Sequence, residues 1–199
     1  MATLDREFYR RDPREVAPDL LGKVVVAGGR RGRIVEVEAY CGGVDPAAHS
    51  YRGLTARNAT MFGPPGHLYV YFSYGLHWCC NPVCGEPGEA VAVLLRALEP
   101  LAGLDAMRAA RPGVVDRDLC RGPARLCAAL GITGAADGAD LVTGDRGLTI
   151  VDDGTPPPAE PAVGARVGIT LGADSPWRWW VPDSPFVSRG RGAPPRRRR

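Results

Sequence analysis

Two carboxylates and a tyrosine occupy every second position near the end of the segment R-I-V-E-V-E-A-Y (33–40). Strand alternation predicts that Glu36, Glu38 and Tyr40 share one face with Ile34. The opposite face would be apolar and suit a core: Val35, Val37 and Ala39. Glu38 and Tyr40 would lie roughly 7 Å apart, so an acid that moves protons and a flat ring that stacks could line one pocket. The alternative is a solvent-exposed strand surface.

Tyrosines dominate a second segment, Y-V-Y-F-S-Y-G (69–75). Alternation predicts a strand with Tyr69, Tyr71 and Ser73 on one face, and the pattern breaks at the following tyrosine–glycine pair as it does at a turn. Core packing would explain such tyrosines, and so would a surface that stacks on a flat ligand. The residues alone leave both interpretations open.

A third segment, A-V-A-V-L-L-R-A-L (90–98), is apolar except for Arg96. The alternation of a strand puts Arg96 and Leu94 on one face. An arginine within such a strand needs an anionic or polar partner, which a phosphate or a carboxylate such as Glu38 would provide. An arginine at the end of the strand would instead reach solvent.

The long polar segment 41–66 predicts a functional loop, because loops of this length are rarely idle in compact domains. It contains His49 and, further along, Thr55 and Arg57, whose side chains are able to meet phosphate oxygens. A single histidine in a loop is more often an ordinary surface residue.

Short helical and turn patterns separate these segments. A helical stretch runs to about residue 20, and a glycine-bounded turn at 29–32 joins strands 23–28 and 33–40 into a hairpin. The remaining predicted elements are helices at 101–111 and 121–131, strands at 148–151 and 166–171, and a proline-rich linker at 155–161. The mixture predicts one α+β domain with a largely antiparallel sheet over residues 1–188 and a basic, disordered tail over 189–199.

Composition narrows the class of protein. Lys23 is the only lysine among the 25 basic residues, and arginine is the better bidentate partner for phosphate. Nucleic-acid binding is therefore one of two open interpretations, and the basic tail either lies along phosphates or has no role. No apolar run is long enough for a membrane span and no signal core begins the chain, so we expect a cytoplasmic protein. Serine-esterase, P-loop and dinucleotide motifs are absent.

Six cysteines are present, and without an export signal they are expected to be reduced. Cys79, Cys80 and Cys84 lie close to His77 in the sequence, which is a pattern that a metal site could use. No second ligand pair follows at zinc-finger spacing. Core cysteines are therefore the default prediction, and no metal or cofactor is expected.

Several motifs follow one another in a fixed order and together carry a resemblance. They are R-I-V-E-V-E-A-Y, A-A-H-S, T-A-R-N-x-x-M-F, L-Y-V-Y-x-x-Y-G, V-L-L-R-A-L-E-P and L-C-x-G-P-A-R-L-C. Over residues 15–188 the chain resembles the alkyladenine (3-methyladenine) DNA glycosylase family, the mammalian-type enzymes with bacterial relatives. The resemblance implies a curved sheet flanked by short helices, without a helix-hairpin-helix motif, and hydrolysis of the N-glycosidic bond of damaged purines in base-excision repair.

The resemblance also implies roles for individual residues. Glu38 matches the general base that activates the attacking water, Arg96 an arginine near that water, and Tyr74 the tyrosine that intercalates into DNA. The pocket for the flipped base would be formed by Tyr40, His49, Tyr71 and Asn81, the last of which screens guanine-like bases. Residues expected near the DNA backbone are Thr55, Arg57, Met61, Tyr69 and Arg125, with core packing as the alternative for Tyr69.

Double-stranded DNA that contains damaged purines is the expected partner, and a monomer associated with the bacterial nucleoid is the expected state. Glycosylases that also cut the strand use an amine to form a Schiff base. Because the only lysine, Lys23, stands at the start of a strand, we expect a monofunctional enzyme that uses water. The alternative is a non-catalytic nucleic-acid-binding domain in which Glu38 does no chemistry.

Overall fold

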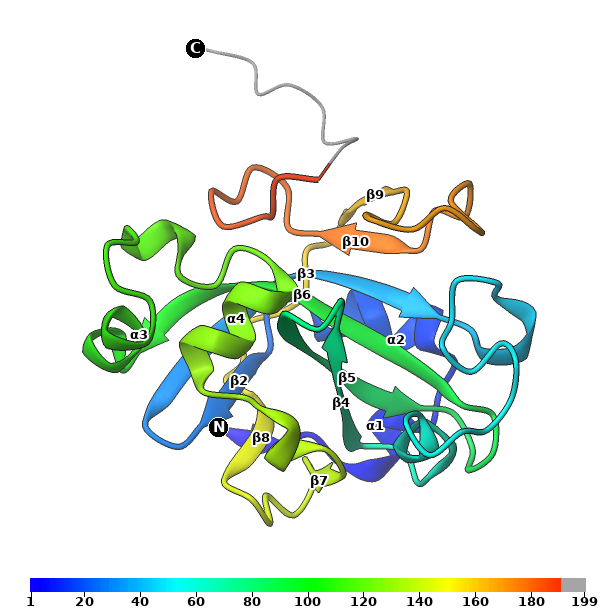
Figure 1. Cartoon of the computed structure of the whole chain (residues 1–199). Coiled ribbons are helices and arrows are strands. Elements are labelled where there is room, and N and C mark those ends of the chain that lie inside the picture. The colour runs from blue at the N-terminus through cyan, green and yellow to red at the C-terminus, as the bar shows by residue number, and fades with distance from the viewer. Residues whose placement is uncertain (191–199) are drawn as a thin grey trace.

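A curved antiparallel sheet frames the molecule (Figure 1), and the computed structural model describes residues 1–190. Its strands run in the order β1 (Ala2–Thr3), β8 (Leu148–Asp152), β2 (Val24–Ala27), β3 (Arg30–Tyr40), β6 (Val91–Ala102), β5 (His77–Cys84), β4 (His67–Ser73) and β7 (Ala139–Asp140). Two short strands, β9 (Ala162–Gly164) and β10 (Arg178–Trp180), extend the sheet beside β3. The predicted α+β class with a curved, largely antiparallel sheet is confirmed.

Short helices flank this sheet: α1 (Arg6–Tyr9), α2 (Pro13–Leu20), α3 (Leu104–Ala110) and α4 (Pro123–Leu130). Asp12 caps α2, because its side chain accepts a hydrogen bond from the N–H of Arg14. Gly131 ends α4 in the left-handed conformation, as its place after the last helical turn predicts. Helix α3 begins three residues later than predicted, because β6 continues to Ala102. No helix within residues 1–190 is long and apolar enough to cross a membrane.

The apolar residues form two clusters. The main core lies between the sheet and helices α2 and α4, and includes Leu20 and Leu126 with the inward side chains of β3, β5 and β6. A smaller cluster lies under the 41–66 loop and consists of Met61, Tyr69, Val83, Ala90 and Ala92. The second cluster gives that loop a fixed base, although the loop itself contains only two short 3₁₀ turns, Gly42–Val44 and Ala59–Phe62.

The pairing of β3 with β6 is irregular where the functional residues begin. The register shifts between Ile34 and Glu36 and again between Glu36 and Val37. These irregularities re-aim the strand, so that Ile34 lies in the same core as Val37. The prediction that Ile34 shares the polar face is therefore wrong, whereas Glu36 and Glu38 do avoid the main core.

Two further predictions differ from the structure. The hairpin turn between β2 and β3 is formed by Gly28 and Gly29, since Arg30 already pairs with Ala27, so the turn is shorter than the predicted 29–32. The segment 166–171 is not a strand. Its polar groups are bonded elsewhere: the Val167 N–H donates to a carboxylate and the Arg166 side chain is buried in an ion pair. The predicted tail lies, from residue 191 onward, outside the described residues.

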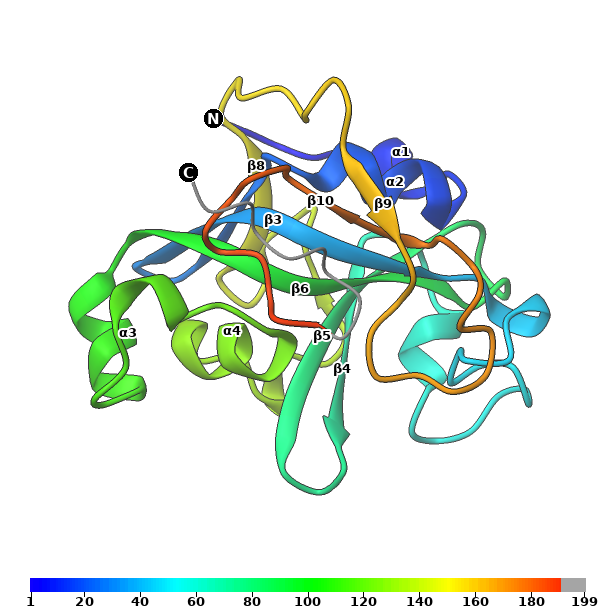
Figure 2. The same cartoon turned by 90° about the horizontal axis from the view of Figure 1, so that it is seen from above.

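Strands β4 and β5 form a hairpin that extends beyond the rest of the sheet (Figure 2). Its register pairs Tyr69 with Asn81 and Tyr71 with Cys79. Residues 74–76 form the turn at its tip and are exposed to solvent. The predicted turn is thus confirmed. The hairpin carries two of the residues predicted for the base pocket, Tyr71 and Asn81, and the predicted intercalating residue, Tyr74.

Candidate active site

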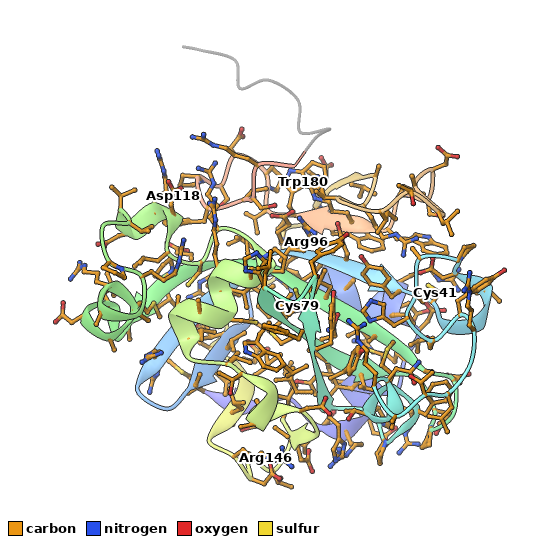
Figure 3. All side chains as sticks on the ribbon, in the orientation of Figure 1. Cys41, Cys79, Arg96, Asp118, Arg146 and Trp180 are labelled. Carbon is orange, nitrogen blue, oxygen red and sulfur yellow. The ribbon has the colours of Figure 1, made fainter. Side chains whose placement is uncertain are left out.

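A cavity of about 570 Å³ opens beside the β4–β5 hairpin. Strands β3 to β6, the 41–66 loop and residues 167–169 contribute to its wall, and Figure 3 places two of its lining residues, Arg96 and Cys79, near the middle of the molecule. The cavity brings together most of the predicted site residues, which are Tyr40, His49, Arg57, Met61, Tyr69, Tyr71, Tyr74, Asn81 and Arg96. Thr55 and Arg125 do not line it.

Glu38 lies directly behind the cavity wall and is fully buried. One carboxylate oxygen, Oε1, accepts a hydrogen bond from the N–H of Val167 at 2.7 Å and pairs with Arg96 Nη1 at 3.1 Å. The other, Oε2, accepts a hydrogen bond from the Tyr40 hydroxyl at 3.0 Å. All three partners line the cavity. The carboxylate is therefore held by the groups that form the wall, and Arg96 has the carboxylate partner that its strand position requires.

Burial raises the pKa of Glu38 above the usual value for a glutamate. The positive charge of Arg96 and the two hydrogen bonds to the carboxylate act in the opposite direction, and the negative charge of Glu36 adds to the increase. The pKa of Tyr40 is also raised, first by burial and then by Glu38, so the phenol stays protonated and remains a donor to that carboxylate.

Glu36 does not line the cavity and holds the guanidinium of Arg96 in place. Its Oε1 accepts hydrogen bonds from Arg96 Nε and from Arg178 Nε, each at 2.8 Å. Its Oε2 accepts a hydrogen bond from the Ser188 N–H at 2.6 Å. Sequence reasoning placed Glu36 on the correct face but did not predict this role, because two of its partners lie more than 140 positions away along the chain. The signal in the sequence was the pair of acids at alternating positions of one strand, Glu36 and Glu38.

Three aromatic rings of the cavity wall contact one another. Tyr71 stacks on Tyr69 with ring centroids 5.4 Å apart, and His49 meets Tyr71 edge-on at 4.4 Å. His49 Nδ1 lies 3.1 Å from the Tyr69 hydroxyl, which orients the imidazole. Burial, and then the nearby Arg57, lower the pKa of His49, so the imidazole is neutral at pH 7. The predicted alternation of tyrosines is confirmed, because Tyr69, Tyr71 and Ser73 all line the cavity.

Two residues predicted near the DNA backbone, Tyr69 and Met61, are buried in the free protein. Tyr69 is only 1% exposed and Met61 only 3%, and both belong to the small cluster below the loop. Both residues support the cavity wall, and burial favours the packing alternative for Tyr69; their contacts with the DNA backbone stay predictions. Asn81 is also buried at this wall, where its Nδ2 donates to the carbonyl oxygen of Tyr69 at 3.1 Å.

Tyr74 is the most exposed of the large hydrophobic side chains on the hairpin. It is 87% exposed and has a φ of 50°, in the left-handed region that few non-glycine residues adopt. Thr55, Arg57 and Arg125 are exposed on the surface as well. Arg57 stands at the cavity rim, where its Nη2 donates to the carbonyl oxygen of Phe72 at 3.0 Å. Contacts of these residues with DNA remain predictions.

The cysteines of β5 do not act as a group. Cys79 lines the cavity, whereas Cys80 and Cys84 point into the main core. Burial raises the pKa of the Cys79 thiol to about 11. Within residues 1–190 there is no group of three or more His, Cys, Asp or Glu side chains that could hold a metal ion.

Comparison with known proteins places this chain in a family. The family model described as methylpurine-DNA glycosylase matches residues 7–185. A Burkholderia lata protein, provisionally named a 3-methyladenine DNA glycosylase, is 64% identical over 189 residues, which cover 94% of this chain and 91% of that protein. Proteins with the same provisional name are 52% identical in Rhodopseudomonas palustris, covering 94% of this chain and 88% of that protein, and 48% identical in Streptomyces avermitilis, covering 98% and 95%. The chain belongs to the methylpurine-DNA glycosylase family, and the predicted resemblance is confirmed.

Proposed function

We propose that this DNA glycosylase turns an alkylated or deaminated purine out of duplex DNA into the aromatic cavity and hydrolyses its N-glycosidic bond with a water activated by Glu38. The observation that carries the proposal is the position of Glu38 behind the wall, with its carboxylate held by three groups that all line the cavity. A buried, ionisable acid held beside a cavity is suited to take a proton from water.

The aromatic wall suits a flat cationic base. An N-alkylated purine carries a positive charge and leaves readily, so stacking against Tyr40 and Tyr71 would favour it by cation–π attraction. A neutral His49 adds a third ring without adding a like charge. Neutral bases such as hypoxanthine leave less readily, so for them the geometry of Glu38 and the water matters more. Asn81 lines the same wall, and we expect it to reject purines with an additional exocyclic group.

The proposed capture of the base needs a substitute in the DNA stack. Turning a base out of a duplex costs a few kcal/mol, and a wedge side chain fills the gap that remains. Tyr74 stands exposed at the tip of the projecting hairpin and at the mouth of the cavity. Its ring is therefore available to the base pairs on either side of a flipped nucleotide.

A base-release assay tests the proposed function. The protein is incubated with duplexes that carry 3-methyladenine, hypoxanthine or ethenoadenine, and with an undamaged duplex of the same sequence. We expect release of the free base from at least the 3-methyladenine duplex and none from the undamaged control. Binding to every duplex without release from any of them would contradict the proposal and favour the non-catalytic DNA-binding domain.

The single lysine bears on the type of reaction. Lys23 is buried and its Nζ pairs with Asp152 at 2.7 Å, and it does not line the cavity. An amine in this position cannot form a Schiff base with the sugar. We therefore expect base release without strand cleavage, and no covalent enzyme–DNA adduct after borohydride reduction. A trapped adduct would show that the enzyme attacks the sugar with an amine rather than with water.

A further inference from the structure

A buried ion pair between Asp45 and Arg166 joins the 41–66 loop to the segment that precedes residues 167–169. Asp45 follows the first 3₁₀ turn of the 41–66 loop, and Arg166 precedes the cavity-lining residues 167–169. Both side chains are fully buried, and Arg166 Nη2 donates to Asp45 Oδ1 at 2.8 Å while Nη1 pairs with Oδ2 at 2.5 Å. The two residues are 121 positions apart in the chain, so neither loop alone indicates the contact.

The pair holds the backbone on both sides of Tyr40. Arg166 Nη1 donates to the carbonyl oxygen of Ala39 at 3.1 Å, immediately before the tyrosine. Asp45 Oδ2 accepts a hydrogen bond from the N–H of Cys41 at 3.1 Å, immediately after it. One ion pair therefore fixes where Tyr40 leaves the end of β3.

The same guanidinium also contacts the ring of Tyr40. The Arg166 guanidinium carbon lies 4.7 Å from the centroid of the Tyr40 ring and 5.0 Å from that of Trp177. A planar cation on an aromatic face restricts the tilt of the ring. Because Tyr40 lines the cavity and its hydroxyl donates to Glu38, the tilt affects both the stacking surface and the carboxylate.

Arg166 acts on Glu38 by a second route through the chain. The next residue, Val167, donates its N–H to Glu38 Oε1 at 2.7 Å, so the anchoring of Arg166 sets the position of that donor. Among the described residues, the Nε of Arg166 is buried without a hydrogen-bond partner. Leaving a buried donor unpaired costs free energy, which a pair selected for stability alone would avoid.

We propose that Arg166 and Asp45 form a positioning pair that sets the plane of Tyr40 and the Val167 N–H on Glu38, and thereby the geometry of base stacking and of proton transfer. The proposal rests on the proposed function, since it describes how two of its working groups are held. Neither Arg166 nor Asp45 touches the base in this scheme, and neither belongs to the cavity wall.

The test compares Arg166→Lys and Asp45→Asn with a matched control, Arg33→Lys. Lysine keeps the charge but loses the two-pronged contact and the planar stack, whereas asparagine keeps the shape of Asp45 but not its charge. Arg33 also makes a two-pronged contact, to Asp153 at 2.8 and 3.1 Å. It lies on β3, the strand that carries Tyr40, and does not line the cavity. Each variant is measured for melting temperature, lesion-duplex affinity and single-turnover release between pH 4 and pH 9.

We expect Arg166→Lys and Asp45→Asn to lower single-turnover release by about tenfold, because a small misplacement of reacting groups is costly. We also expect both variants to lose activity, as the pH is lowered, at a higher pH than the wild type does. Glu38 is faced by Arg96 from β6, by Glu36 and Tyr40 from its own strand and by Arg166, so a looser Val167 N–H leaves its charged form less supported. Arg33→Lys is expected to lose stability alone.

Failure of the proposed function and failure of the positioning pair would give different results. An inactive wild-type protein on every lesion duplex would overturn the proposed function itself. An active wild type whose Arg166→Lys and Asp45→Asn variants release base as fast as Arg33→Lys, with an unchanged pH profile, would overturn the positioning pair and assign it a structural role only. If Arg166→Lys does not fold, Asp45→Asn carries the same comparison, because it is nearly isosteric.

Discussion

Replacement of Glu38 by glutamine is expected to remove nearly all base release while binding to lesion-containing duplex persists. Glutamine fills the same space and can still meet Tyr40 and Val167, but it cannot take a proton from water. The loss of a general base corresponds to about 10²–10⁴-fold in rate. Single-turnover release and fluorescence anisotropy on the same 3-methyladenine duplex measure the two properties separately.

The pH dependence of the wild-type enzyme provides an internal check on this prediction. Burial raises the pKa of Glu38, and only the ionised form is a base. The rate of base release by the wild type should therefore be maximal above that pKa and fall as the pH falls through it. The fall should begin at a higher pH than it would for an exposed glutamate. Any residual release by Glu38→Gln should lack this step.

A matched control for the glutamine variant is Glu99→Gln, which removes a carboxylate of β6 that does not line the cavity. We expect this variant to release base at the wild-type rate. Wild-type release by Glu38→Gln would show that the proposed mechanism is wrong. A wild-type protein that binds lesion duplex but never releases base would instead identify a DNA-binding domain in which Glu38 does no chemistry.

The sequence predicts those parts of the site that depend on local alternation. Tyr69, Tyr71 and Ser73 face one cavity because a regular strand carries them, and Glu38 meets Arg96 because β3 and β6 are neighbours. Alternation fails at Ile34, since a register shift in one strand pair leaves no mark in composition. The resemblance to a family, rather than periodicity, is what distinguished Tyr74 from the other tyrosines of its segment.

The contacts that hold the site in place are not predictable by the same reasoning. Val167 reaches Glu38 across 129 positions, and Ser188 reaches Glu36 across 152. Both donors lie in segments without regular secondary structure, so no period indicates where their side chains or N–H groups point. The segment 166–171 resembles a strand by composition, but its residues serve the buried carboxylates instead of a strand partner.

Replacement of Tyr74 by serine is expected to weaken capture of the flipped base without affecting the fold. The ring is 87% exposed, so its removal takes almost nothing from the core. A stacked aromatic ring contributes about 1–3 kcal/mol per base, so we expect the affinity for lesion duplex to fall by roughly tenfold to a hundredfold. The dissociation constant is measured by anisotropy with the Glu38→Gln background, in which no base is released, and the melting temperature is measured in parallel.

The neighbouring residue Leu76 supplies the control for this prediction. It is 70% exposed on the same turn but does not line the cavity, so Leu76→Ser removes apolar surface from the tip without removing the proposed wedge. We expect Leu76→Ser to weaken lesion binding less than Tyr74→Ser does. Equal losses would mean that the tip binds DNA through general apolar contact. A lower melting temperature for Tyr74→Ser, with unchanged affinity, would mean that the tyrosine serves the fold. An intercalating side chain makes its contacts with DNA, so its removal should lower the affinity for DNA and leave the stability of the free protein unchanged.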